Sequence, residues 1–204
     1  MQYYILKNRK MPWGDYGNIL FEGLLNVMDK NYNITEIHSI ERVAPYIPEI
    51  YKTHFGFLVI REDIYKILKD NGITGIEKLH KAEFKKLVEI DWQSWDLEAP
   101  NPKIKPRGGE PINYINGRKH NEKLLENIKH QYFSLELKEE NFKRIFETIS
   151  DKPDYENYTD VLLISEKVKY DIFIGGAIVV SEKFKNVIEK YTDNCLRFIP
   201  LNQV

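Results

Sequence analysis

The sequence predicts an α+β fold, with a single domain over residues 1–204 in which helices pack on a mixed sheet. Two segments carry most of this prediction. The stretches 57–70 and 177–190 each begin with four apolar residues and continue with apolar residues at helical spacing. A break and a further apolar stretch follow each one, which predicts strand, helix and strand twice. Apolar runs at 161–168 and 170–174 predict two more strands. A chain of 204 residues is long enough for such a domain.

The two strand–helix segments resemble each other. Every apolar position of the second segment is apolar in the first, although only two of the fourteen aligned positions are identical. Two interpretations stay open: structurally related halves at 1–90 and 118–204, or unrelated units of similar composition. The stretch between these halves, 91–117, contains four prolines and a Gly-Gly pair, which predicts a long irregular connection.

The remaining elements are expected in order along the chain. Apolar spacing predicts a strand at 2–7, a helix at 19–28 capped by Asn18, a short polar helix at 121–130 and a helix with one apolar face at 137–149. The segment 34–50 alternates only weakly and contains two prolines, so no element is assigned to it.

Three single residues carry local predictions. Gly72 suits the left-handed position that follows the end of a helix. Ser181 lies between a strand and a helix, where its hydroxyl is expected to cap the helix. Cys195 is the only cysteine, which excludes an internal disulfide and a multi-cysteine metal site, and its apolar surroundings predict burial.

Composition excludes several classes of function. The chain has 30 Lys and Arg against 31 Asp and Glu, a formal net charge of -1, so direct binding of nucleic acid is not expected. No apolar run approaches the roughly 20 residues of a membrane span, and no targeting segment is recognisable. The sequence therefore predicts a cytoplasmic protein without membrane association.

Motif searches suggest no enzyme chemistry. The five histidines stand in none of the usual metal-ligand spacings, and no phosphate-binding loop or nucleophile elbow is present. Accordingly, no catalytic residue, metal or cofactor is predicted. The alternative is a small enzyme whose site is assembled from distant carboxylates and histidines.

The segment 91–98 is the predicted contact surface for a protein partner. It combines two large aromatic residues with three acids and has no Lys or Arg. The predicted contact residues are Asp91, Trp92, Trp95, Asp96 and Glu98. Tryptophan is a frequent anchor at interfaces, and a local charge of -3 suits a basic cleft. The competing interpretation places both tryptophans in the core. In a third alternative, Asp91 and Asp96 form the carboxylate pair of a glycosidase.

The stretch 103–129 is basic, with seven Lys or Arg against three Glu. Nucleic-acid binding would require aromatic residues between these charges, and only Tyr114 is there. A solvated loop and helix is the preferred interpretation of this stretch.

Several segments together resemble one protein family. They are Tyr-Tyr-Ile-Leu-Lys at 3–7, Phe-Leu-Val-Ile at 57–60, Gly-Ile-Thr-Gly-Ile-Glu at 72–77, Ile-Val-Val-Ser-Glu-Lys-Phe at 178–184 and Arg-Phe-Ile-Pro-Leu at 197–201. The chain resembles the bacterial immunity proteins encoded beside polymorphic or contact-delivered toxins, first catalogued as a domain of unknown function. The resemblance implies a non-catalytic protein that binds and neutralises a cognate toxin encoded nearby. Because no signal peptide is recognisable, the toxin is expected to act in the cytosol. A non-catalytic adaptor is a further alternative.

Overall fold

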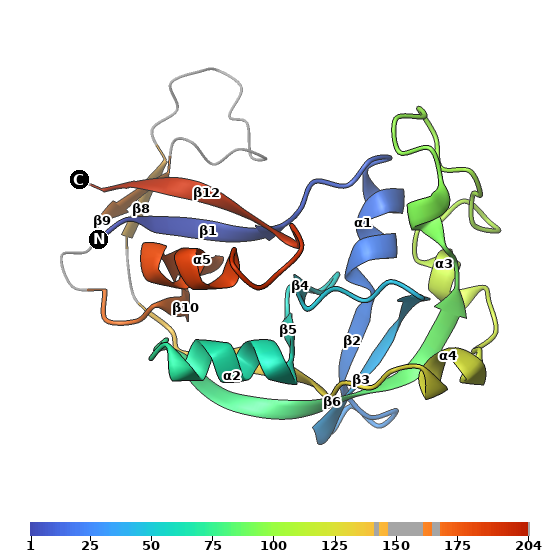
Figure 1. Ribbon diagram of the computed structural model, residues 1–204, viewed down its shortest axis with the longest axis horizontal. Coiled ribbons are helices and arrows are strands. Elements are labelled where there is room, and N and C mark those ends of the chain that lie inside the picture. Colours follow the sequence, from blue (N-terminus) through green and yellow to red (C-terminus); the bar gives the residue numbers. More distant parts are fainter. Residues whose placement is uncertain (141–142, 147–160, 165–167, 204) are drawn as a thin grey trace. The chain divides into compact units, whose positions relative to one another are not determined.

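The computed structural model describes residues 1–140, 143–146, 161–164 and 168–203 (Figure 1). Helices occur together with mixed and antiparallel sheets, so the predicted α+β class is confirmed. Contacts group the chain into two compact units. The first comprises Met1–Lys7, Asp63–Leu79 and Glu136–Val204, and the second comprises Asn8–Glu62 and His80–Leu135. These units alternate along the chain, and their boundaries differ from the halves 1–90 and 118–204.

The first unit is built on a mixed sheet. Among the described residues its strand order is β10-β11-β1-β12-β9-β8. The strands are β1 (Tyr3–Asn8), β8 (Lys143–Phe146), β9 (Val161–Ile164), β10 (Ile172–Ile174), β11 (Ile178–Ser181) and β12 (Leu196–Gln203). β11 lies antiparallel to both β1 and β10, whereas β12 and β9 are parallel. A buried cluster of apolar side chains from β1, β10, β11 and β12 forms the core here.

The second sheet also has six strands, in the order β2-β3-β6-β7-β5-β4, and all of it except the start of β6 and the end of β7 belongs to the second unit. Its strands are β2 (Leu24–Met28), β3 (Ile34–Ala44), β4 (Ile50–Lys52), β5 (Leu58–Arg61), β6 (Ile76–Glu89) and β7 (Tyr132–Leu137). β3 and β6 are parallel, and the pairs β2–β3, β4–β5 and β5–β7 are antiparallel. The backbone N–H of His54 donates to the carbonyl oxygen of Gly23 at 3.1 Å. The sheet therefore curls until its two outer strands approach each other at one end.

Short helices complete the chain. They are α1 (Asp15–Glu22), α2 (Glu62–Asp70), the 3-10 turn η1 (Trp92–Ser94), α3 (Asn113–Asn116), α4 (Glu122–Glu126) and α5 (Glu182–Ile188). No helix of the described part is long and apolar enough to cross a membrane.

The repeated strand–helix–strand pattern is confirmed at both places. β5, α2 and β6 form the first instance, and β11, α5 and β12 form the second. The local predictions hold as well: Gly72 has a φ of 63°, and the Ser181 hydroxyl accepts a hydrogen bond from the Phe184 N–H at 3.2 Å. Cys195 is fully buried, as expected.

The helix predicted at 19–28 is wrong in its position. α1 begins before Asn18 and ends at Glu22, and the second half of the predicted segment is strand β2. Gly23 separates the two elements with a φ of 61°. A side chain at this position would place its Cβ 2.6 Å from the Cβ of Arg42, so only glycine allows β2 to leave the helix this close to β3.

The helix predicted at 137–149 is contradicted where the structure describes it. Lys143–Phe146 forms strand β8, which pairs antiparallel with β9. The apolar positions Ile145 and Phe146 fit helical spacing, but two adjacent apolar residues also fit a strand. Pairing with a neighbouring strand thus overrides the local pattern. The stretches 141–142 and 147–149 of that prediction lie outside the described residues.

Candidate protein-binding surface

The hairpin of β2 and β3 extends beyond the sheet that supports it. Cross-strand pairing runs from Leu24 opposite Glu41 to Met28 opposite Ile34. β6 accompanies β3 only from His38 to Ala44. The end of the hairpin is therefore a two-stranded ribbon, and such ribbons gain little stability from their own contacts.

Hydrogen bonds to one carboxylate fix the turn of this hairpin. The Asp29 Oδ1 atom accepts from the backbone N–H of Asn31 at 2.8 Å and from that of Asn33 at 3.0 Å. The bonds from Asn33, followed by the one from Asn31, lower the pKa of Asp29 below its usual value. Tyr32, between the two asparagines, has a φ of 64°. The hydrogen bonds to Asp29 thus stabilise the turn although it is exposed.

Four large apolar side chains are exposed on this ribbon. The exposed fraction is 85% for Tyr32, 77% for Ile34, 48% for Met28 and 47% for Ile37. Met28 and Ile34 lie opposite each other across the two strands, and the register of the strands shifts between Asn26 and Met28. We call these four residues the hairpin tip. Apolar side chains gathered on a surface, unlike scattered ones, are typical of protein-binding sites.

The predicted contact segment 91–98 is divided by the structure. Trp92 and Trp95 are buried, and the rings of Trp95 and Trp13 lie 5.7 Å apart. The competing interpretation of the tryptophans as core residues is therefore correct, and they supply no exposed anchor. Asp91, Asp96 and Glu98 are exposed. Contact between these three acids and a basic partner stays a prediction.

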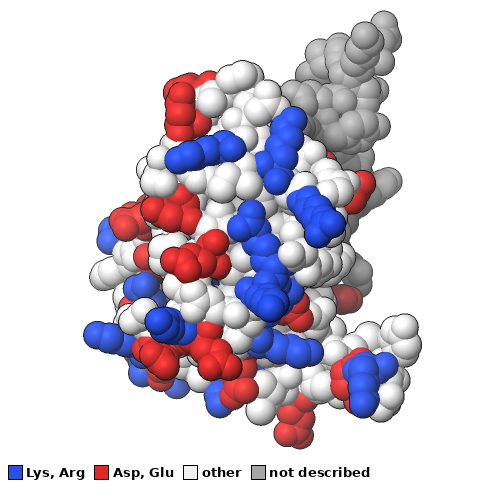
Figure 2. Space-filling view, turned by 90° about the vertical axis from the view of Figure 1, so that its right-hand side faces the viewer, with Lys and Arg blue, Asp and Glu red and all other residues white. Residues whose placement is uncertain are grey.

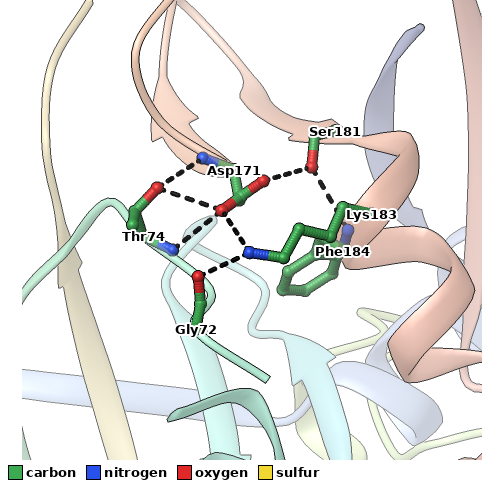
Figure 3. A network of polar contacts seen from close by, with 6 residues as sticks. All are labelled: Gly72, Thr74, Asp171, Ser181, Lys183 and Phe184. Carbon is green, nitrogen blue, oxygen red and sulfur yellow. Dashed lines mark hydrogen bonds and ion pairs between the residues drawn. The ribbon is translucent and has the colours of Figure 1, made fainter. Parts of the chain in front are cut away.

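A buried carboxylate organises the first unit (Figure 3). Asp171 Oδ1 accepts from the Ser181 hydroxyl at 2.8 Å, and Oδ2 accepts from the Thr74 hydroxyl at 3.0 Å and from the Thr74 N–H at 3.1 Å. Lys183 Nζ lies 3.5 Å from Oδ2 and donates to the Gly72 carbonyl oxygen at 2.6 Å. These contacts join the loop after α2 to β10 and α5, and every oxygen of the carboxylate is occupied. The arrangement fits a structural role.

A second polar cluster joins three segments of the other unit. Glu22 Oε2 lies 3.4 Å from His54 Nδ1, and Glu22 Oε1 accepts from Asn8 Nδ2 at 3.2 Å. Burial raises the pKa of Glu22, and the hydrogen bonds from Asn8 and His54 offset only part of that effect. Burial also lowers the pKa of the neighbouring Lys52. The cluster lies at the end where the outer strands of the sheet approach each other.

The raised pKa of Glu22 predicts how stability depends on pH. The folded state binds this proton more tightly than the unfolded state, so stability falls as the pH rises through the ordinary glutamate range towards the raised value. Glu22→Gln removes the titration, and its stability relative to the wild type should be higher at pH 7 than at pH 4. Urea unfolding at both pH values measures the difference. The exposed Glu36→Gln variant is the control, and equal behaviour of the two variants would contradict the assignment.

Two histidines on neighbouring strands of the second sheet, His38 on β3 and His80 on β6, are in contact. The rings of His38 and His80 stack with centroids 4.4 Å apart, and His38 Nδ1 lies 2.5 Å from the Ser134 hydroxyl. Among the residues that the structure describes, no three His, Cys, Asp or Glu side chains are grouped as they would be around a metal ion.

The hairpin tip could not be recognised because Met28 fell in the helix predicted at 19–28, whereas Ile34 and Ile37 fell in the unassigned segment 34–50. A local signal was present: Asp-Lys-Asn-Tyr-Asn at 29–33 is rich in the residues that favour turns. Comparisons with known proteins add nothing to the site, since no family model and no curated protein match this chain.

Proposed function

We propose that this chain binds another protein through the hairpin tip, and that the partner is a cognate toxin that it neutralises. The main observation in support of this proposal is that Tyr32 and Ile34 are exposed on a ribbon whose turn is hydrogen-bonded to Asp29. The hydrogen bonds to Asp29 favour the conformation of the turn before binding, which lowers the entropy cost of ordering this surface. The resemblance to immunity proteins supports the choice of a toxin as the partner.

The shape of the ribbon indicates what the partner offers. The exposed apolar side chains gather at the turn end of the ribbon, so a groove that encloses this end buries more of them than a flat surface would. The exposed acids Asp29 and Glu36 flank the apolar residues, with Lys30 as the opposing charge. A toxin groove with apolar walls and a basic rim is the expected complement.

Binding to the protein encoded by the adjacent gene tests the proposal. The double variant Tyr32→Ala with Ile34→Ser should bind at least about thirtyfold more weakly than the wild type, because truncation of central interface residues typically costs about 2 kcal/mol or more. The same variant should fail to protect cells that produce the toxin. Calorimetry and a growth assay provide the two readouts.

Matched controls separate this surface from apolar exposure in general. Tyr191 is 50% exposed and Ile104 is 42% exposed, and both lie outside the hairpin. Tyr191→Ala with Ile104→Ser should bind as the wild type does. Wild-type affinity of the hairpin variant would contradict the proposal, and so would a hairpin-dependent homodimer that excludes the toxin.

A second candidate function is an enzyme with a site assembled from distant residues. The pair of Glu22 and His54 favours it, since a carboxylate that orients a histidine is a frequent arrangement in acid–base catalysis. A folded His54→Gln variant tests this candidate. If the variant neutralises the toxin as efficiently as the wild type does, that result counts against an enzyme.

A further inference from the structure

A hollow on the second unit collects basic side chains. It has a volume of about 600 Å³ and lies between the end of β6 and the start of α4. Arg118, Lys119 and Lys123 line it together with His120. In Figure 1, α4 and the segment before it lie on the right-hand side, and Figure 2 faces that side. Lys and Arg side chains follow one another down the middle of this face, and acidic side chains gather mainly to one flank.

The backbone of β6 holds the lining segment in place. Leu87 donates its N–H to His120 Nδ1 at 2.9 Å, and its carbonyl oxygen accepts from the Asn121 N–H at 2.9 Å. Asn121 then caps α4 by accepting from the Lys123 N–H at 3.1 Å. The segment that carries Arg118 and Lys119 is thus hydrogen-bonded to β6 through His120 and Asn121, and Lys123 lies in the capped helix α4. This arrangement differs from a freely solvated loop.

The hydrogen bond from Leu87 also fixes the proton on His120. Because Nδ1 accepts, the ring proton of the neutral imidazole is on Nε2, and this atom can donate to a ligand. The hollow therefore offers one neutral donor in addition to three cations. Two carboxylates, Glu89 and Glu122, also line it, and Glu89 Oε2 accepts from the Asn121 side-chain amide at 2.8 Å.

We infer that this hollow binds a small anion with two or more phosphate groups. Arg118 presents the planar donor pair that matches phosphate oxygens, and the two lysines add charge at separate points. A single phosphate cannot contact cations distributed over 118–123 as well as a diphosphate can. The carboxylates of Glu89 and Glu122 reduce the formal charge of the lining to +1, which is little for the extended phosphate backbone of a nucleic acid. No Phe, Tyr or Trp of the described residues lines the hollow, so recognition depends on the phosphates.

Calorimetric titration of the full chain with pyrophosphate at low ionic strength tests this inference. Pyrophosphate should bind with a submillimolar Kd and orthophosphate several-fold more weakly. Arg118→Gln and Lys123→Gln should each weaken pyrophosphate binding about tenfold, as expected for loss of a charge-assisted hydrogen bond. Lys105→Gln, an exposed basic residue of the same stretch outside the hollow, is the control and should change the affinity less than twofold.

Three results would overturn the inference. They are no binding heat at about 5 mM pyrophosphate, an equal loss of affinity in Lys105→Gln, and tighter binding of a hexaglutamate peptide than of pyrophosphate. The last result would reassign the hollow to an acidic protein segment. The hairpin variant Tyr32→Ala with Ile34→Ser should bind pyrophosphate normally, so failure here and failure of the toxin-binding proposal are separate outcomes.

Discussion

Trp92→Ala is expected to lower the free energy of unfolding by about 3–5 kcal/mol, the range for removing a buried aromatic side chain. Only 1% of Trp92 is exposed. Its ring meets that of Tyr46 edge to face at 5.6 Å, and the guanidinium of Arg9 lies 5.4 Å from the ring centroid. Truncation leaves a cavity beneath both neighbours. Urea unfolding measures the loss.

A conservative variant refines the test. The Trp92 Nε1 atom is buried and has no hydrogen-bond partner among the described residues. Trp92→Phe therefore loses ring area but no hydrogen bond, and it should cost less than half as much as the alanine variant. Leu97→Ala, at a half-exposed position nearby, should change stability by no more than about 0.5 kcal/mol. A loss below about 1 kcal/mol in Trp92→Ala would show that this ring is not part of the core.

Asp171→Ala is expected to destabilise the chain by about 3 kcal/mol, because it removes the acceptor of three hydrogen bonds at once. The Ser181 hydroxyl and both donors of Thr74 lose their partner, and Lys183 loses its counter-charge (Figure 3). The exposed Asp193→Ala in the same unit is the matched control and should change stability by about 0.5 kcal/mol or less.

The pH dependence of this loss gives a second readout. Burial raises the pKa of Asp171, but the hydrogen bonds from Ser181 and Thr74 together with Lys183 lower it more, so the net pKa lies below the ordinary aspartate value. The stabilisation is therefore present above the ordinary value and is lost as the pH falls through the lowered one. The stability difference between wild type and Asp171→Ala should shrink in acid. A difference independent of pH would argue against a charged Asp171 in the network.

Features set by neighbouring residues could be predicted from the sequence. Ser181 stands between an apolar run and a helical pattern, and Gly72 follows the last turn of another, so each cap depends only on its local surroundings. The two strand–helix–strand patterns were recognisable for the same reason. At 143–146 the local pattern was ambiguous, and the pairing of β8 with β9 decided it.

The sites depended on distant contacts and were harder to predict. The sequence favoured the core interpretation for Trp92 and Trp95 but left the anchor interpretation open, and the contacts with Tyr46 and Trp13 decide between them. The weak alternation at 34–50 has a physical cause, because β3 is supported by β6 over only part of its length. Its outer end keeps apolar residues in solvent, and a pattern based on burial cannot describe such a strand.

The place of β1 in its sheet has a consequence for biosynthesis. β1 lies between β11 and β12, and the Gln2 side chain donates to the carbonyl oxygen of Leu201 at 2.7 Å. Its two neighbours, β11 and β12, are therefore synthesised long after β1 has left the ribosome. Until those strands have been synthesised, the apolar residues Ile5 and Leu6 have no sheet to pair with, and they are exposed to premature association in the nascent chain. This strand should therefore be a site where a chaperone protects the growing polypeptide.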